Sequence, residues 1–109
     1  MTDLAKIAEI VDTAALTAKA IPQFSDTEAL SMEAAYAVQA LSMQRRYARG
    51  EKRIGMKMGF TSRAKMVQMG LSDMIWGRLT DGMREEEGSA ISLADYVHPR
   101  VEPEVAFLM

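Results

Sequence analysis

The sequence contains no cysteine, and it has only one histidine and one tryptophan among its 109 residues. Without cysteine there is no disulfide framework and no thiolate metal site, and a single histidine does not provide the ligands of a structural zinc ion. No run of about 18 apolar residues occurs, and no basic segment precedes an apolar stretch at the N-terminus. We therefore expect a soluble cytoplasmic protein.

The chain also lacks a large excess of positive or negative charge. The chain has 13 basic and 15 acidic residues, a formal net charge of −2, so it carries no electrostatic footprint for nucleic acid or for an anionic membrane surface. We expect neither as a partner. What the chain does contain is 49% hydrophobic and 26% charged residues, which fits one globular domain with an adequate core.

The N-terminal part shows helical periodicity. Apolar residues at three- and four-residue spacing predict an amphipathic helix over residues 3–20, which we expect Pro22 to end. Residues 21–30 mix a breaker with turn formers and are expected to form a loop, although Ser25 and Glu28 have the spacing of a capping box.

A second helix is predicted over residues 32–49, with Ser31 as its N-cap and Gly50 in the left-handed conformation after its end. Its apolar positions are broad enough to bury more than one face, so we expect it to lie under another element. Arg45, Arg46 and Arg49 place cations near the carbonyl end of this helix. We interpret them as capping residues, and the alternative is a patch for phosphate or nucleic acid.

After the second helix the period changes to two, which predicts a strand with one apolar face (Ile54, Met56, Met58, Phe60) and one nearly bare face (Gly55, Lys57, Gly59). Flanking glycines leave Lys57 uncrowded, so its ammonium group could hold a carboxylate or transfer a proton. The alternative is an exposed strand lysine between glycines that sheet packing requires. The glycine spacing does not match a phosphate loop or a dinucleotide site.

The middle of the chain is predicted mainly from turn residues. The expected features are a short helix over residues 63–69 with Met66 and Met69 in the core, a turn at Asp81-Gly82, a solvated hairpin tip at residues 85–88, and one helical turn or loop at residues 92–96.

Residues 97–108 alternate again and predict a strand whose polar face carries His98, Arg100, Glu102 and Glu104. Two carboxylates at positions i and i+2 of a strand lie on the same side, about 7 Å apart. Oxygen ligands of this kind suit Mg²⁺ or Mn²⁺, so the pair is a candidate metal site. The alternative is a solvated strand face on which His98 and Arg100 neutralise the glutamates.

The pattern as a whole, two helices followed by strands, predicts an α+β fold. The sequence ends inside the apolar run Val105–Met109 without a turn residue or a polar tail. We therefore expect a chain that stops in the middle of a strand.

Three ordered motifs carry a resemblance to a known family: residues 55–62 (Gly-Met-Lys-Met-Gly-Phe-Thr-Ser), 75–81 (Ile-Trp-Gly-Arg-Leu-Thr-Asp) and 98–107 (His-Pro-Arg-Val-Glu-Pro-Glu-Val-Ala-Phe). Together they resemble the 4-oxalocrotonate decarboxylases, which group with the 2-hydroxypenta-2,4-dienoate hydratases in the fumarylacetoacetate hydrolase superfamily. The resemblance implies an N-terminal helical segment over residues 1–50 and, over residues 51–109, the start of a mixed β-rich catalytic domain that is incomplete at the C-terminus.

The resemblance also implies roles for residues. Glu102 and Glu104 match the family's ligands for Mg²⁺ or Mn²⁺, with a third acidic ligand expected some thirty positions further on, beyond Met109. Lys57 matches a lysine of the substrate pocket, and Arg100 would orient carboxylates or metal ligands. The implied partners are a small 2-oxo-enedioate substrate, other copies in a homo-oligomer, and the hydratase of the same meta-cleavage pathway for aromatic compounds.

The reaction type is predicted from one departure within the family. Hydratases read Pro-Asp-Phe-Gly where this chain has Met74-Ile75-Trp76-Gly77, so an apolar residue replaces an aspartate thought to act in proton transfer with water. This favours metal-dependent decarboxylation of 2-oxohex-3-enedioate to 2-hydroxypenta-2,4-dienoate and CO₂. The alternatives are hydration of the dienoate and a non-catalytic binding module. With two of three metal ligands, the 109-residue chain alone is expected to be inactive.

Overall fold

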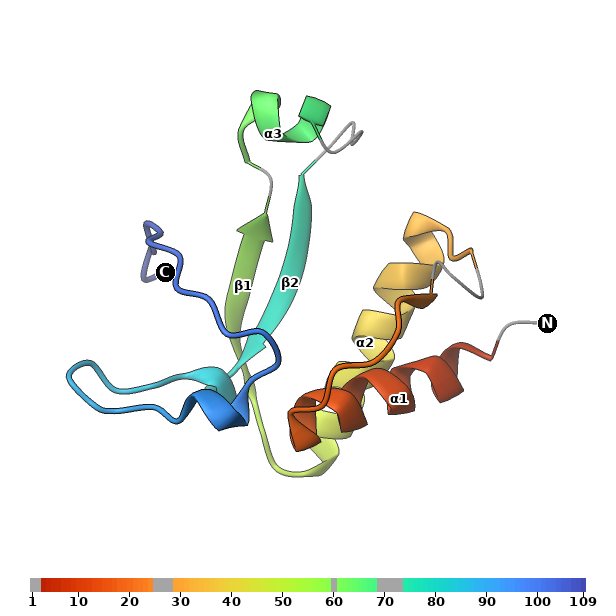
Figure 1. The fold of residues 1–109 in the computed structure, drawn as a ribbon, viewed down its shortest axis with the longest axis horizontal. Helices are drawn as coiled ribbons and strands as arrows, with labels where there is room; N and C mark the ends of the chain where they lie inside the picture. Colours follow the sequence, from red (N-terminus) through yellow and green to blue (C-terminus); the bar gives the residue numbers. More distant parts are fainter. Residues whose placement is uncertain (1–2, 25–28, 60, 69–73) are drawn as a thin grey trace.

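The computed structural model describes residues 3–24, 29–59, 61–68 and 74–109, and it has helices first and a sheet second. Helices α1 (Leu4–Thr17) and α2 (Met32–Ala48) precede the antiparallel strands β1 (Arg53–Gly59) and β2 (Ile75–Thr80), and the short helix α3 (Arg63–Gln68) lies between the strands. Two 3-10 turns follow, η2 (Asp81–Met83) and η3 (Leu93–Asp95). In Figure 1 helices α1 and α2 lie on one side of the strand pair, the C-terminal segment lies on the other, and α3 lies at the upper end of the strands. The predicted α+β class is confirmed.

Helix α1 is shorter than the sequence predicts. It starts after Asp3, whose carboxylate accepts a hydrogen bond from the Lys6 backbone N–H at 3.1 Å. It ends at Thr17 because Ala18 adopts a left-handed conformation with φ of 54° and its N–H bonds back to the helix. The prediction that the helix runs to residue 20 and ends at Pro22 is therefore wrong, since the chain leaves the helix before the proline.

Helix α2 follows the prediction closely. The Ser31 hydroxyl accepts a hydrogen bond from the Ala34 N–H at 3.1 Å, which confirms Ser31 as the N-cap. Gly50 has φ of 100°, a conformation that residues with a side chain rarely adopt. Helices α1 and α2 pack around a small core of Ile7, Ala8 and Val38, with Leu4, Val11, Phe24 and Leu30 against it.

The register of the two strands determines which residues lie next to Lys57. Lys57 lies opposite Gly77, and Gly59 lies opposite Ile75. Side chains directly opposite each other in an antiparallel pair point to the same face. Strand β2 is a feature that the sequence analysis does not recognise as a strand, since residues 74–80 show no clear alternation of apolar and polar side chains.

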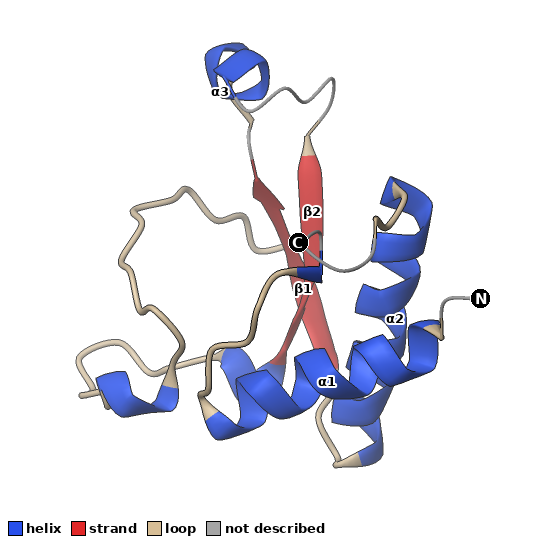
Figure 2. Cartoon of the chain, turned by 45° about the vertical axis from the view of Figure 1, so that its right-hand side comes forward, coloured by secondary structure: helices blue, strands red, loops and turns tan. Residues whose placement is uncertain are grey.

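Helix α2 covers the outer edge of β2 (Figure 2). The Trp76 N–H donates to the Tyr36 hydroxyl at 3.1 Å, and the Gln39 side chain bonds both the Trp76 carbonyl at 3.1 Å and the Arg78 N–H at 3.0 Å. The Tyr36 and Trp76 rings stack with centroids 4.8 Å apart, and the Arg78 guanidinium lies over Trp76. The N–H and carbonyl of Trp76 and the N–H of Arg78 thereby find partners on α2. This confirms that α2 lies under another element as well as against α1.

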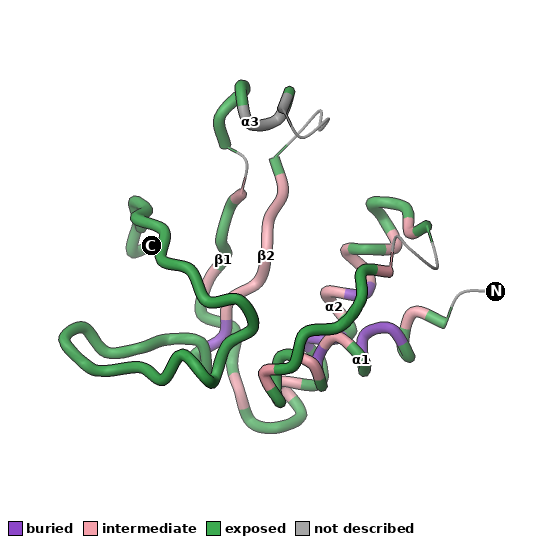
Figure 3. Tube along the Cα trace, viewed as in Figure 1, coloured by how far each residue is buried: buried purple, intermediate pink, exposed green. Residues whose placement is uncertain are grey.

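The C-terminal segment does not form the predicted strand. Residues 97–109 have no strand assignment and are exposed throughout, as the green tube in Figure 3 shows. Val101 is 96% exposed and Phe107 84%. The prediction of a strand over residues 97–108 is wrong for a physical reason: no described strand pairs with this segment, and an extended chain gains little without a partner for its backbone groups.

Other local predictions have mixed outcomes. Residues 85–88 are exposed and Gly88 turns with φ of 84°, but strands do not flank this turn within residues 74–109, so it is not a hairpin tip. The single turns at η2 and η3 are confirmed. Some predicted features lie outside what the structure describes, namely Phe60, Met69, the Met66 side chain and the capping box at residues 25–28.

Across the described ranges, each helix is too short or too polar to cross a membrane.

Candidate metal and substrate site

The candidate site is built on the bare face of β1. Lys57 stands at the middle of this strand, and its neighbours on the same face are Gly55, Gly59 and, across the pair, Gly77. A Cβ atom added at Gly55 or Gly77 would meet nothing within 4 Å. At Gly59 it would lie 2.9 Å from the Ile75 side chain. The face around Lys57 is therefore open, and Ile75 closes it at one end.

Two carboxylates reach the Lys57 ammonium group from the C-terminal segment. Its Nζ atom forms an ion pair with the Glu104 carboxylate and lies 3.5 Å from Oε2 of Glu102. The sequence marks the lysine and the glutamates as two separate candidate sites. The structure brings all three together, although 47 positions separate Lys57 from Glu104.

Lys57 and Glu104 stabilise each other in their charged forms. The hydrogen bond from Lys57 lowers the pKa of Glu104 below its usual range, and the same bond raises the pKa of Lys57 above its usual range. All three side chains stay between 45% and 66% exposed. Solvent therefore screens the interaction, so the cluster does little for folding and its charges stay accessible to a ligand.

The arrangement fits a hard divalent cation in its chemistry. Glu102 and Glu104 turn their carboxylates toward one positive charge, and oxygen ligands of this kind are those that Mg²⁺ and Mn²⁺ prefer. In the structure the Lys57 ammonium is the positive charge between them. Within the described ranges there is no group of three or more histidine, cysteine, aspartate or glutamate side chains that could hold a metal. The two glutamates could therefore supply at most part of a metal site.

Arg100 and His98 do not join the cluster. Both are exposed, and neither forms a hydrogen bond or ion pair with another residue that the structure describes. His98 has a positive φ of 48°, which turns the backbone just before the glutamates. The glutamates are therefore neutralised by Lys57 and not by His98 and Arg100, as the alternative interpretation supposes. The role of Arg100 stays a prediction.

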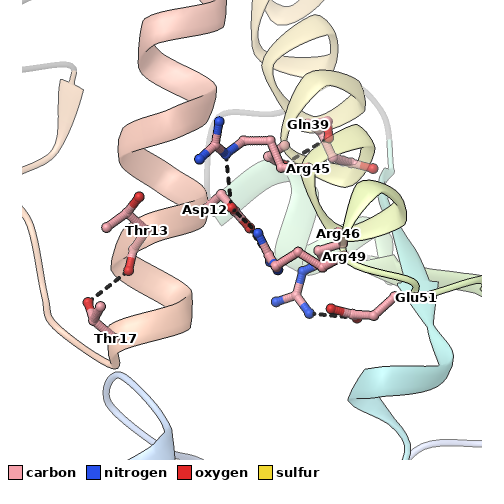
Figure 4. A network of polar contacts seen from close by, with 9 residues as sticks. Asp12, Thr13, Thr17, Gln39, Arg45, Arg46, Arg49 and Glu51 are labelled. Carbon is pink, nitrogen blue, oxygen red and sulfur yellow. Dashed lines mark hydrogen bonds and ion pairs between the residues drawn. The ribbon is translucent and has the colours of Figure 1, made fainter.

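A second cluster, which the sequence analysis misses, joins α1 to α2 (Figure 4). The Asp12 carboxylate is buried at 3% exposure and accepts hydrogen bonds from Nε of Arg45 at 3.0 Å and from the two terminal nitrogens of Arg49 at 2.7 and 2.8 Å. The bonds from Arg49 are the main reason that the pKa of Asp12 lies below its usual range, despite burial. A lone carboxylate in the apolar stripe of the first helix, one turn after Ala8, is the signal that could have found it.

The basic cluster of α2 is therefore an ion-pair cluster more than a helix cap. Arg46 donates to the Glu51 carboxylate at 3.1 Å, and the buried Thr80 hydroxyl donates to the same oxygen. The Thr80 bond is the largest cause of a lowered pKa of Glu51. Because these arginine donors are used by carboxylates, the alternative of a phosphate or nucleic-acid patch loses its basis. The contacts instead fix α2 to the base of the sheet that carries Lys57.

Several known proteins are similar in sequence to this chain. The chain is 52% identical over 106 residues to a 4-oxalocrotonate decarboxylase of Pseudomonas sp, which covers 97% of this chain and 41% of that protein. It is 37% identical over 103 residues to a 4-oxalocrotonate decarboxylase of Pseudomonas sp. (strain CF600), covering 94% of this chain and 39% of that protein. The TodF product hydratase of Pseudomonas putida (strain F1) is 41% identical over 78 residues, 72% of this chain and 29% of that protein. No protein-family model matches the chain.

The fold is also similar to that of a 4-oxalocrotonate decarboxylase. A solved structure of 4-oxalocrotonate decarboxylase from Pseudomonas putida G7, complexed with magnesium and adipate, superposes with a TM-score of 0.68 at 39% identity, covering 72% of this chain and 30% of that chain. In fold and in sequence the chain is thus similar to a class of proteins that contains decarboxylases and dienoate hydratases. Within that class, its resemblance to the 4-oxalocrotonate decarboxylases is confirmed. The chain spans about two fifths of the length of the curated decarboxylases it matches.

Proposed function

We propose that this chain takes part in the divalent-metal-dependent decarboxylation of 2-oxohex-3-enedioate (4-oxalocrotonate) to 2-hydroxypenta-2,4-dienoate and CO₂. The observation that carries the proposal is the convergence of Lys57, Glu102 and Glu104 on the open face of β1. The similarity to 4-oxalocrotonate decarboxylases over 97% of the chain supports it. Because the chain spans about two fifths of those relatives, we assign the complete reaction to a protein of the relatives' length.

The chemistry of this reaction suits the residues in the cluster. Glu102 and Glu104 would hold the cation, which supplies Lewis-acid polarisation of the 2-oxo group. The bond to the distal carboxylate carbon breaks, its electron pair passes into the conjugated enone, and CO₂ leaves. Lys57 would hold a substrate carboxylate or donate the proton that the resulting dienolate oxygen takes up. Arg100 would orient carboxylates once the substrate is bound.

The open lysine face also suits the shape and charge of the substrate. The adipate in the Pseudomonas putida G7 structure is a six-carbon dicarboxylate, as is 2-oxohex-3-enedioate. Because Gly55 and Gly77 present no side chains beside it, the Lys57 ammonium group can approach a substrate carboxylate closely. Ile75 presents an apolar side chain at the end of this face, at the position where hydratases of the family have an aspartate. This supports decarboxylation over addition of water.

We further propose that residues 51–109 contribute the first elements of a mixed β-rich catalytic domain, and residues 1–50 a helical segment packed beside it. The two-stranded sheet of the described residues supports this, because such a sheet is rarely stable without further strands or a covering layer. The exposed apolar side chains of residues 101–109 support further packing, in a homo-oligomer or against the pathway hydratase.

The experiment uses a protein extended to the relatives' length. Purified protein with Mg²⁺ and 2-oxohex-3-enedioate should release CO₂ and should hydrate 2-hydroxypenta-2,4-dienoate slowly. Rapid hydration without CO₂ release would assign the hydratase activity, which the 41% identity to the TodF product hydratase keeps as the second candidate. Binding of the enedioate without either product would indicate a non-catalytic binding module.

A further inference from the structure

We propose that Lys57 is the internal counter-cation of the Glu102 and Glu104 pair: its ammonium group holds the cation position until a divalent cation displaces it, and displacement frees the lysine for the substrate. This inference rests on the proposed function and adds an order of events to it. Metal loading and release of the lysine become a single step.

The geometry points to competition for one position. Lys57 forms an ion pair with Glu104 and lies 3.5 Å from Glu102, so both carboxylates share one positive charge. A divalent cation held by the same two carboxylates would bring like charges within a few ångströms of each other, which is unfavourable even where solvent screens it. The ammonium and the metal therefore compete for this position.

The surroundings of Lys57 allow it to move. Neither Gly55 nor Gly77 presents a side chain next to it, and space is open above both glycines. The Lys57 side chain is 46% exposed, and its flexible stem can swing across this face without a steric barrier. Within the part of the chain that the structure describes, both ion pairs of Lys57 are with the two glutamates, so once these bind a metal the ammonium needs a new anionic partner.

The substrate is that partner, and the coupling works in both directions. An anionic ligand that binds the freed ammonium binds better when the metal is present, and by linkage the metal binds better when that ligand is present. A dicarboxylate substrate would thus find its lysine available only at a metal-loaded site. Before loading, the lysine keeps the two carboxylates from repelling each other.

The test measures Mn²⁺ affinity by water-proton relaxation on a protein extended to the relatives' length, without any need for turnover. Lys57→Gln removes the competing charge and should tighten Mn²⁺ binding about fivefold, the effect of two exposed ion pairs. Lys57→Arg keeps the charge and should leave the affinity near that of the wild type. The matched control is Lys52→Gln, which makes the same charge change at an exposed lysine outside the glutamate cluster.

A second readout follows the lysine itself. Addition of Mg²⁺ should shift the NMR signals of the Lys57 ε-methylene group and leave those of Lys52 in place. Equal Mn²⁺ affinity in the wild type and in Lys57→Gln, tighter binding by Lys57→Arg, a response of Lys52→Gln as large as that of Lys57→Gln, or an unmoved Lys57 signal would each overturn the inference.

The variant Glu104→Gln distinguishes an error in the counter-cation role of Lys57 from an error in the proposed function. If Glu104→Gln weakens Mn²⁺ binding while Lys57→Gln does not change it, the glutamates bind metal and only the counter-cation role is wrong. If Glu104→Gln leaves Mn²⁺ binding unchanged, or if all variants and the wild type fail to bind Mn²⁺, the metal assignment falls and the inference falls with it.

Discussion

Replacement of Asp12 by asparagine should destabilise the helical half of the protein more than any change at its surface. Asp12 is 3% exposed and accepts three hydrogen bonds from Arg45 and Arg49. A hydrogen bond to a charged group contributes about 1.5 to 3 kcal/mol, but the two arginine side chains are 43% and 34% exposed and can rehydrate. We therefore expect Asp12→Asn to lower the free energy of unfolding by about 2 kcal/mol.

The assay is urea denaturation at pH 7, followed by far-UV circular dichroism. The matched control is Glu9→Gln on the same helix, because among the described residues Glu9 pairs with Lys6 alone, at 3.7 Å, and the two side chains are 49% and 62% exposed. That change should cost less than about 0.5 kcal/mol. Equal losses in the two variants would refute the argument that burial and hydrogen bonding give the Asp12 cluster its strength.

The same cluster predicts a dependence on pH. Because the pKa of Asp12 is lower in the folded state than in the unfolded state, its contribution is fully present above the unfolded value of about 3.9 and is lost as the pH falls through the folded value. The stability difference between the wild type and Asp12→Asn should therefore shrink below about pH 4. A difference that stayed constant down to pH 2 would contradict the lowered pKa.

Three further predictions concern the site and its support. In a protein of the relatives' length, Glu104→Gln should remove most decarboxylase activity at limiting Mg²⁺ with little change in melting temperature, while the exposed Glu87→Gln should be silent in both assays. Gln39→Leu should cost about 1 to 3 kcal/mol in urea denaturation, because backbone groups of Trp76 and Arg78 lose their partner. The 109-residue chain alone should show no turnover and no thermal shift at millimolar Mg²⁺, and it should self-associate in sedimentation experiments; a monomer with a Mg²⁺-dependent rise in melting temperature would contradict this.

The parts of the fold that the sequence predicts well depend on local signals. Ser31 caps α2 through a hydrogen bond to a residue three positions away, and Gly50 takes the left-handed conformation that a helix end favours. The bare face of Lys57 is likewise local, because alternation along one strand decides which neighbours share its side. In each case the residues that form the feature are adjacent or one turn apart.

The parts that the sequence does not predict depend on contacts between distant residues. Asp12 contacts Arg49 at a separation of 37 positions. A carboxylate within an apolar stripe indicates that it needs a partner, but periodicity alone does not say which residue that partner is. Strand β2 is stabilised by β1 on one edge and by Gln39 on the other, so its identity comes from its neighbours and not from its own pattern. The end of α1 at Ala18 shows the same limit on a smaller scale, since a residue with no special signal adopts the turn.

Alternation in a sequence is usually taken to imply both a paired strand and alternate side chains on one side. The C-terminal segment shows the second without the first. A strand needs a partner for its backbone groups, and residues 97–109 have none among the described elements, so that prediction fails. The direction of alternate side chains needs no such partner, because carboxylates at positions i and i+2 of an extended chain already lie on one side. Glu102 and Glu104 both meet Lys57 although no strand forms. The contact of both glutamates with Lys57 therefore does not depend on a strand: spacing decides which side chains lie on one side of the chain, whereas pairing decides whether they stand on a sheet.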